Sequence, residues 1–261
     1  YPYEACSQYD RIATCTTGAE HINNKEIPLI SLKGETDFLQ DVHATAEHTW
    51  ALIMALIRRV PFAHNDVGMG NWKREAWQGT ELYGKTLGIV GYGRVGRQVE
   101  RYALAFGMNV IICDPPSIIE EYFHTIHDCY RRDRTLDGLL READIVTVHV
   151  PLNTETYGMF CMDQFELMKP TAYFVNTSRG GLIDETDLED ALAYGVIAGA
   201  ALDVISGEPY ITEYFQLRTL FKDNLIITPH IAGNTKESRH KTQMFIAGKI
   251  KDWVNTKGEC D

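Results

Sequence analysis

The 261-residue sequence predicts an α/β fold in which helices cover both faces of a doubly wound parallel sheet. The first observation is the alternation, from residue 86 onward, of short apolar runs typical of buried strands with helical patterns. The second is a glycine-rich turn between one such run and the helix after it. The third is that polar clusters follow the later runs, which predicts one site at the carboxyl edge of the sheet.

Before residue 86 the sequence predicts a different arrangement. Two short strands are expected at residues 11–14 and 27–32, with a turn at Gly18 between them. Residues 37–59 contain neither proline nor glycine and show a helical pattern of apolar positions, so we expect one long helix that Pro61 terminates. Residues 62–85 carry Trp72, Trp77 and several charged side chains, and we expect them to form an irregular arm.

The alternation after residue 85 predicts a specific order of elements. Strands are expected at residues 86–90, 108–113, 145–150, 172–176, 198–204 and 225–228. Helices are expected at residues 97–106, 163–168, 185–194 and 236–254. Because strands and helices take turns along the chain, neighbouring strands are expected to run parallel.

The turn after the first of these strands is a G-x-G-x-x-G motif formed by Gly91, Gly93 and Gly96. The first glycine permits a tight turn, the second lets the backbone approach a pyrophosphate, and the third lets helix and strand pack closely. The helix that follows offers its N-terminal amides to the phosphates. Asp114, at the end of the next strand, is an acid suited to the ribose hydroxyls. This order of elements predicts a dinucleotide-binding Rossmann domain.

Asp114 also indicates which dinucleotide binds. Its carboxylate would repel the 2′-phosphate of NADP, and Pro115 and Pro116 follow it without an adjacent arginine to hold a phosphate. We therefore expect NAD as the cofactor. The alternative is that Asp114 only caps the next turn.

Four polar clusters follow the later strands, at residues 149–152, 176–181, 203–209 and 228–233. Reduction of a carbonyl by a hydride needs an acid to protonate the new alkoxide and a cation to hold the substrate. His230 suits the acid role, Glu208 would favour its imidazolium form, and Arg179 is suited to clamp a carboxylate. Each has a plainer alternative: a hydrogen-bonded core histidine, a turn-capping loop residue and a surface ion-pair partner, respectively.

The other histidines are expected to have no catalytic role. His149 lies at a strand end and is expected to shape the adenine pocket. His43, His48 and His64 lie in or just after the long helix, and the spacing of His43 and His48 is poor for a shared metal. We therefore interpret these three as structural and expect no metal site.

The composition argues against several classes of partner. A formal net charge of −11 without a dense basic run disfavours nucleic acid and anionic membranes. The longest apolar run, residues 50–57, is far shorter than the about 20 residues of a membrane span. The cysteines are scattered without a C-x-x-C pair, which predicts reduced thiols in a cytoplasmic protein. They are Cys6, Cys15, Cys113, Cys129, Cys161 and Cys260.

With these motifs the chain resembles the D-isomer-specific 2-hydroxyacid dehydrogenases. The matching stretches are residues 83–87, 91–97, 143–156, 168–184, 200–209 and 228–233, and residues 16–23 are similar to the family's substrate loop. They follow the family's order and spacing over nearly the whole chain. The resemblance implies a Rossmann domain joined to a partial, flavodoxin-like substrate domain.

The resemblance also implies reversible, NAD-dependent reduction of a 2-oxo acid to a D-2-hydroxy acid. Arg179 would bind the carboxylate and carbonyl of the substrate, and His230, paired with Glu208, would be the general acid in reduction and the base in oxidation. Backbone amides around Cys15 and Thr16 would face the substrate carboxylate, although Thr16 stands where many members have glycine. The implied cofactor-binding residues are Gly91, Gly93, Arg94, Val95, Gly96, Asp114, His149, Val150, Pro151, Thr156, Thr177, Ser178, Asp203 and Gly233.

The sequence departs from the family at both ends. Residues 1–41 correspond only to the last part of the family's substrate domain, so we expect that domain to be N-terminally shortened. Residues 42–234 would form the NAD-binding domain, with a dimerisation helix and arm at 42–85, and residues 235–261 a C-terminal helix returning toward the substrate domain. We expect a homodimer that acts on a small 2-oxo or 2-hydroxy acid. A non-catalytic NAD(H)-binding sensor or scaffold, and a truncated product without independent function, are the alternatives.

Overall fold

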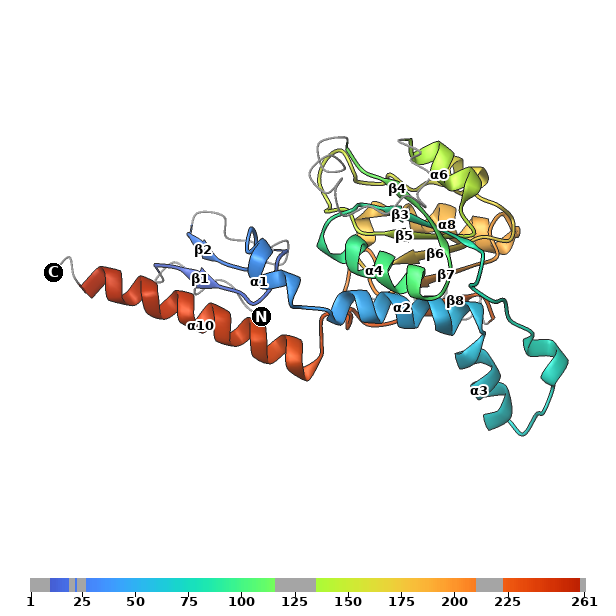
Figure 1. The fold of residues 1–261 in the computed structure, drawn as a ribbon, viewed down its shortest axis with the longest axis horizontal. Helices are drawn as coiled ribbons and strands as arrows, with labels where there is room; N and C mark the ends of the chain where they lie inside the picture. Colours follow the sequence, from blue (N-terminus) through green and yellow to red (C-terminus); the bar gives the residue numbers. More distant parts are fainter. Residues whose placement is uncertain (1–9, 19–21, 23–26, 116–134, 210–222, 259–261) are drawn as a thin grey trace. The chain divides into compact units, whose positions relative to one another are not determined.

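The computed structural model describes residues 10–18, 22, 27–115, 135–209 and 223–258. The chain divides into two compact units, of which the first comprises Tyr1–Ala44 with Gly233–Asp261 and the second comprises Thr45–Ala232. The second unit contains the large sheet that is labelled β3 to β8 in Figure 1. Pro116, Cys6, Cys129 and Cys260, on which part of the sequence interpretation depends, lie outside the described residues.

The second unit is built on a six-stranded parallel sheet, which confirms the predicted fold class. Its strands are β3 (Thr86–Val90), β4 (Asn109–Cys113), β5 (Ile145–Val148), β6 (Tyr173–Asn176), β7 (Gly199–Leu202) and β8 (Leu225–Ile227). The strand order is β4-β3-β5-β6-β7-β8. From β3 the chain continues to β4 on one side, and from β5 it continues through β6, β7 and β8 on the other side. The boundary between β3 and β5 is therefore the switch point at which such sheets bind ligands.

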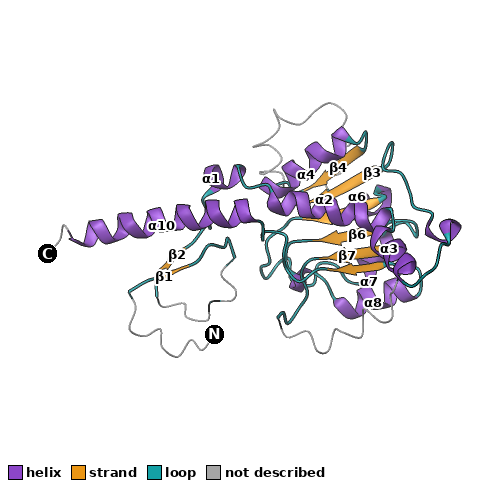
Figure 2. Cartoon of the chain, turned by 90° about the horizontal axis from the view of Figure 1, so that it is seen from below, coloured by secondary structure: helices purple, strands orange, loops and turns teal. Residues whose placement is uncertain are grey.

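Helices cover both faces of this sheet, as Figure 2 shows. One face packs against α2 (Ala44–Ile57) and α4 (Arg94–Ala105), where Leu87 and Ile89 of β3 enter the apolar cluster. The other face, with Val90, packs against α6 (Leu136–Glu142), α7 (Met162–Leu167) and α8 (Glu185–Ala193). Because successive strand residues point to opposite faces, a strand covered on both sides is largely apolar, with exceptions such as buried Thr147 of β5. This explains why the strands appear in the sequence as continuous apolar runs.

The strand registers align the carboxyl ends of all six strands. The aligned row across the sheet is Cys113, Val90, Val148, Asn176, Leu202 and Ile227. The residues directly after these six therefore follow one another along the carboxyl edge. They are Asp114, Gly91, His149, Thr177, Asp203 and Thr228. All but Thr228 belong to the set that the sequence analysis assigns to the cofactor.

The single helix expected over residues 37–59 is wrong. The structure has α1 (Thr36–Gln40) and then α2, with a break at residues 41–43. The Asp41 carbonyl accepts a hydrogen bond from Lys241 Nζ at 2.8 Å, and Val42 packs into the apolar cluster of the first unit. These contacts with residues far along the chain outweigh the local helical pattern.

The expectation that Pro61 terminates a helix is also wrong. The helix α2 ends at Ile57, and Arg59 has a left-handed conformation with a φ of 55°. Pro61 lies in the first turn of α3 (Val60–Gly68), where its missing N–H leaves no intrahelical bond unmade.

The arm after α2 is more regular than expected. It contains α3 and a short 3-10 helix, η2 (Arg74–Trp77). Asn71 Nδ2 and Trp77 Nε1 donate to the two carboxylate oxygens of buried Asp66, at 2.8 and 2.9 Å. The hydrogen bond from Trp77 is the main cause of the lowered pKa of Asp66. The helix α6 was not expected from the sequence, because it is short and contains Gly138.

The first unit has a small parallel strand pair, β1 (Ile12–Ala13) with β2 (Leu29–Ile30), where two strands were expected. Its apolar cluster includes Ile30, Leu39 and Ile246, the last from α10 (Lys236–Gly258). Phe38 and Phe245 stack with their ring centroids 3.9 Å apart. None of the helices in the described part of the chain has the length and apolar character needed to cross a membrane.

Candidate active site

The glycine turn lies between β3 and α4, and close packing requires two of its glycines. A Cβ at Gly91 would stand 2.7 Å from the His149 carbonyl carbon, and a Cβ at Gly96 would stand 2.2 Å from the Gly91 oxygen. Gly91 also has a φ of 96°, a conformation that favours glycine. Around Gly93, in contrast, no atom apart from those of its own chain neighbours lies within 4 Å of the Cβ position. This leaves space for a pyrophosphate to approach the N-terminus of α4, where Arg94 and Val95 stand.

Asp114 lies beside this turn, at the end of β4. Its Oδ2 accepts a hydrogen bond from the backbone N–H of Tyr92, and its side chain stays partly exposed. Burial raises the pKa of Asp114, and the hydrogen bond from Tyr92 opposes that rise. A carboxylate is thus fixed next to an uncapped helix N-terminus. The geometry of both groups fits the ribose and pyrophosphate of NAD.

His149 and the residues after it lie against the glycine turn. The His149 N–H donates to the Val90 carbonyl at 2.7 Å, and its Nε2 lies 3.0 Å from Thr147 Oγ1. Burial, together with the charge of Arg94, lowers the pKa of His149 to about 3. The ring is therefore neutral near pH 7, which suits a pocket wall rather than an acid. Beyond Val150, the Thr156 hydroxyl donates to the Pro151 carbonyl at 2.7 Å and closes the loop after β5.

Arg179 is held in a turn that Asn176 shapes. Asn176 is fully buried, its Oδ1 accepts the Ser178 N–H at 2.9 Å, and its Nδ2 donates to the Arg179 carbonyl at 2.8 Å. Ser178 Oγ donates to the Val148 carbonyl at 2.8 Å, which joins this turn to β5. Arg179 Nη1 donates to the Ser178 carbonyl at 2.7 Å. The guanidinium is thereby oriented by its own turn.

Gly180 brings the arginine turn against the loop that carries Glu208. A Cβ at Gly180 would stand 2.1 Å from the Ile205 carbonyl carbon and 2.4 Å from Ser206 N. A side chain at this position would therefore push the two loops apart. Glycine at position 180 is what allows Arg179 and Glu208 to share one site.

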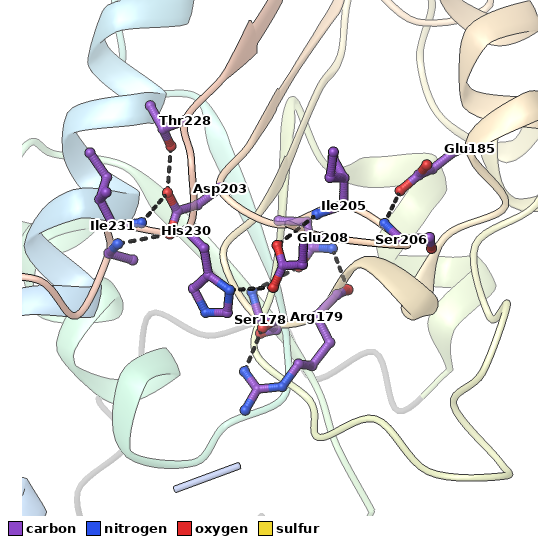
Figure 3. Close-up of polar contacts among 12 residues, drawn as sticks. Ser178, Arg179, Glu185, Asp203, Ile205, Ser206, Glu208, Thr228, His230 and Ile231 are labelled. Carbon is purple, nitrogen blue, oxygen red and sulfur yellow. Dashed lines mark hydrogen bonds and ion pairs between the residues drawn. The ribbon is translucent and has the colours of Figure 1, made fainter. Parts of the chain in front are cut away.

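His230 and Glu208 form a hydrogen bond through His230 Nδ1 and Glu208 Oε1, as Figure 3 shows. Glu208 Oε2 lies 3.4 Å from the Ile205 N–H. Arg179 extends into the same region of Figure 3. Because Nδ1 is bound to Glu208, Nε2 is the imidazole nitrogen left to face a substrate oxygen. The structure thus brings together the three residues that the sequence singles out for chemistry.

The hydrogen bond to Glu208 is the main reason that the pKa of His230 is raised above its ordinary value. Burial acts in the opposite direction, the charges of Glu208 and Asp203 raise the pKa further, and the charge of Arg179 lowers it. The imidazolium form is consequently favoured up to higher pH than in an isolated histidine. This is the form that a general acid requires.

Asp203 is fully buried, and its backbone carbonyl accepts the His230 N–H at 2.8 Å. Its carboxylate accepts hydrogen bonds from Thr228 Oγ1 at 2.5 Å and from the N–H groups of Ile231 and Ala232 at 2.9 and 2.7 Å. Burial alone would raise the pKa of Asp203, but these bonds and one from His48 lower it overall. Asp203 therefore stays ionised and fixes the chain on both sides of His230.

Glu185 is a further buried carboxyl that the sequence interpretation missed. Its Oε1 accepts the Ser206 N–H at 2.6 Å, which supports the loop of Glu208 (Figure 3). Burial raises the pKa of Glu185, the Ser206 bonds oppose this, and the charges of Asp184 and Glu208 raise it further. No local sequence signal distinguishes Glu185 from the other acids that start helix α8.

Three of the expected site residues belong to the first unit: Cys15, Thr16 and Gly233. Cys15 and Thr16 are exposed, and the Thr16 hydroxyl donates to the Gly18 carbonyl at 2.6 Å. Their roles toward substrate and cofactor stay predictions. Among the described residues, no group of three or more histidine, cysteine, aspartate or glutamate side chains has a metal-binding arrangement.

Comparison with known proteins identifies the region that carries this site. Residues 50–232 match the NAD-binding domain of the D-isomer specific 2-hydroxyacid dehydrogenases. The chain is 41% identical over 211 residues to D-3-phosphoglycerate dehydrogenase of Bacillus subtilis, covering 81% of this chain and 38% of that protein. It is 43% identical over 221 residues to glyoxylate reductase of Aeropyrum pernix, covering 82% of this chain and 64% of that protein. The chain thus spans about two fifths to two thirds of these relatives.

Solved structures share the fold over a larger part of the chain. D-lactate dehydrogenase from Aquifex aeolicus, complexed with NAD and lactic acid, superposes with a TM-score of 0.80 at 30% identity. That match covers 97% of this chain and 78% of the other. An acyclic imino acid reductase in complex with NADPH and D-Arg matches with a TM-score of 0.76 at 26% identity, covering 95% of this chain and 76% of that one.

Proposed function

Because this chain belongs to the D-isomer specific 2-hydroxyacid dehydrogenases, we propose that it reduces a 2-oxo acid reversibly to a D-2-hydroxy acid with NADH. The observation that carries the proposal is the His230–Glu208 pair with Arg179 on the carboxyl edge that also bears the glycine turn. Each residue supplies a function that carbonyl reduction needs. The whole arrangement lies within residues 50–232.

In this proposal the side chains hold the substrate and move one proton. When bound, NADH supplies the hydride. Arg179 pairs with the substrate carboxylate and polarises the carbonyl, because its guanidinium presents two parallel N–H groups. His230 donates the proton from Nε2 to the developing alkoxide and takes it back in the oxidation direction. Glu208 holds Nδ1 and stabilises the imidazolium.

Asp114 supports NAD rather than NADP as the cofactor. Its carboxylate lies at the end of β4 and is partly exposed, where it can accept both ribose hydroxyls. A 2′-phosphate at the same place would meet its negative charge. The residues that would hold the rest of the cofactor are the glycine turn for the pyrophosphate and His149 to Pro151 for the adenine.

The test is oxidation of NADH, followed at 340 nm, with glyoxylate, pyruvate, hydroxypyruvate and 3-phosphohydroxypyruvate. The proposal expects turnover with at least one of these acids. NADH binding without oxidation of any of them would instead support a cofactor-binding module without catalysis. Where turnover is found, the rank order of kcat/KM among the four acids assigns the substrate.

The pH dependence should report the Glu208–His230 pair. Reduction needs protonated His230, so kcat/KM for the oxo acid should fall as the pH rises through the raised pKa of His230. Glu208→Gln removes the charge and the carboxylate hydrogen bond that raise the pKa of His230. The falling limb of the profile of kcat/KM against pH should therefore move to lower pH. A pH series of kcat/KM measures this. In the control, Asp190→Asn on the exposed side of α8, the limb should stay in place. An unmoved limb in Glu208→Gln would show that another group titrates.

We propose further that the chain forms a homodimer through α3 and the arm after it. Val60, Val67, Met69 and Trp72 are exposed there by 56%, 49%, 73% and 85%. A cluster of exposed apolar side chains of this kind favours burial against a second copy.

Light scattering at micromolar concentration should give twice the mass of one chain. Met69→Glu combined with Trp72→Glu should give the monomer mass, whereas Tyr194→Glu, at another exposed aromatic residue, should remain dimeric. A monomeric wild type would refute the proposal.

A cytoplasmic location is proposed from the cysteines. In the part of the chain that the structure describes, Cys15, Cys113 and Cys161 are thiols and not disulfides. Scattered thiols of this kind are typical of a reducing compartment.

A further inference from the structure

Two consecutive residues of α2 contact the loops that carry the proposed catalytic groups. His48 Nε2 lies 3.0 Å from Thr228 Oγ1 and 3.3 Å from Asp203 Oδ1. Thr49 Oγ1 lies 2.7 Å from Thr177 Oγ1. Thr228 directly follows β8 and precedes His230 by two positions, and Thr177 directly follows β6 and precedes Arg179 by two positions. One turn of α2 therefore touches the starts of both loops.

Proton counting fixes the direction of the His48 contact. The Thr228 hydroxyl donates its one proton to Asp203 Oδ1 at 2.5 Å. The remaining contact of Thr228 Oγ1, with His48, must then use the oxygen as acceptor. His48 Nε2 therefore carries a proton and donates it to the Thr228 oxygen, with Asp203 Oδ1 close enough to share it.

This chain of bonds holds the backbone at His230 in an unfavourable conformation. His230 has a φ of 52°, in the left-handed region that residues with a Cβ rarely adopt. Its own N–H donates to the Asp203 carbonyl at 2.8 Å, and the Asp203 carboxylate holds the next two N–H groups, of Ile231 and Ala232. Strained backbone of this kind persists only where surrounding bonds determine it. His48 and Thr228 complete the set of donors around the carboxylate that does so.

Thr49 also has its one hydroxyl proton already in use. Its hydroxyl donates to the Thr45 carbonyl at 2.8 Å, which uses its only proton. Thr177 must then donate to Thr49 Oγ1. Thr49 is fully buried and Thr177 is 6% exposed, so water has little access to replace this bond. Loss of the acceptor at position 49 would leave the Thr177 hydroxyl unpaired at the start of the arginine turn.

We propose that His48 and Thr49 are positioning residues for the reaction: His48 fixes the turn that projects His230, and Thr49 fixes the turn that projects Arg179. The inference rests on the proposed function and deepens it. The hydrogen bonds of both residues are made to other protein groups. They act through Thr228 with Asp203 and through Thr177, and they make α2 a common support for the proton donor and the substrate clamp.

The first test compares His48→Leu with His48→Gln, whose amide N–H can replace Nε2–H. We expect His48→Leu to lower kcat by roughly tenfold, about 1.4 kcal/mol in the activation barrier, and His48→Gln to recover most of the loss. NMR titration of the His230 ring supplies a readout that needs no turnover. Its pKa should fall in His48→Leu, because the ring moves away from Glu208 and Asp203, whose charges raise it, while Arg179 opposes them.

The second test compares Thr49→Val with Thr49→Ser, which keeps the hydroxyl. We expect Thr49→Val to raise the KM for the oxo acid by roughly tenfold through displacement of Arg179, and Thr49→Ser to behave as wild type. The NMR resonance of Arg179 Nε–H, assigned by its loss in Arg179→Lys, should shift in Thr49→Val only. Glu47→Gln, an exposed neighbour on α2, is the matched control and should change neither resonance.

These readouts separate the inference from the proposed function. An unchanged His230 pKa in His48→Leu and an unchanged Arg179 resonance in Thr49→Val, with only a lower melting temperature, would overturn the inference. If the His230 pKa changes in His48→Leu and the Arg179 resonance shifts in Thr49→Val, but the wild-type protein reduces none of the oxo acids, the positioning role is supported and the proposed activity is rejected. Shifted resonances with the expected kcat and KM changes would support both.

Discussion

Replacing His230 by alanine should lower kcat for 2-oxo acid reduction by about 10²- to 10⁴-fold, the usual contribution of a positioned general acid. The reason is that His230 is the group whose pKa the structure raises through a bonded carboxylate, and its Nε2 remains to face the substrate. Affinity for NADH should stay close to that of wild type, because His230 is not part of the glycine turn. Stopped-flow measurement of NADH oxidation, with separate titration of NADH binding, gives both quantities.

His240→Ala is the matched control, since His240 is an exposed histidine on α10. It should retain wild-type kcat. If His230→Ala also retained wild-type kcat, the proton would have to come from another group or from water. The assignment of the His230–Glu208 pair as the acid would then be wrong.

Replacing Arg179 by glutamine should lower kcat/KM for the oxo acid by about 10²- to 10³-fold, as expected for loss of a group that stabilises charge in the transition state. Both KM and kcat should change, because the guanidinium is proposed to hold the carboxylate and to polarise the carbonyl. Arg179→Lys should recover part of the loss, since it keeps the charge but not the two parallel N–H groups. Steady-state kinetics with varied oxo acid at saturating NADH measures this.

Arg101→Gln, at an exposed arginine of α4, should leave both constants unchanged. The fold should survive the change at position 179, because the Asn176 bonds to Ser178 N and to the Arg179 carbonyl involve only the backbone of the turn. A KM in Arg179→Gln equal to that of wild type would contradict the clamp role.

The large sheet, and the meeting of Arg179, Glu208 and His230 at its carboxyl edge, could be predicted because both depend on short, local signals. The strand β3 covers the same residues, 86–90, as the predicted run, since a strand buried on both faces is largely apolar. Arg179 and His230 could be placed together because each follows a strand end, and parallel strands align those ends. The glycine turn could be assigned because its three glycines have fixed separations.

The features that could not be predicted depend on contacts between residues far apart in the sequence. The break at residues 41–43 follows from the bond between Lys241 and the Asp41 carbonyl, which no local pattern of residues indicates. The helical pattern of α2 shows that His48 and Thr49 lie in a helix, but not that they meet Thr228 and Thr177. From the sequence alone, only a structural role can be predicted for His48, because its partners Thr228 and Asp203 lie far along the chain.

The most direct test of the account is the configuration of the product. Wild-type protein would be supplied with NADH and whichever of pyruvate, hydroxypyruvate and 3-phosphohydroxypyruvate has the highest kcat/KM, since glyoxylate gives an achiral product. The hydroxy acid formed would be resolved by chiral chromatography. We predict the D enantiomer alone, formed in proportion to the NADH consumed and lost in His230→Ala. Formation of the L enantiomer or a racemate, or the absence of any hydroxy acid, would contradict it.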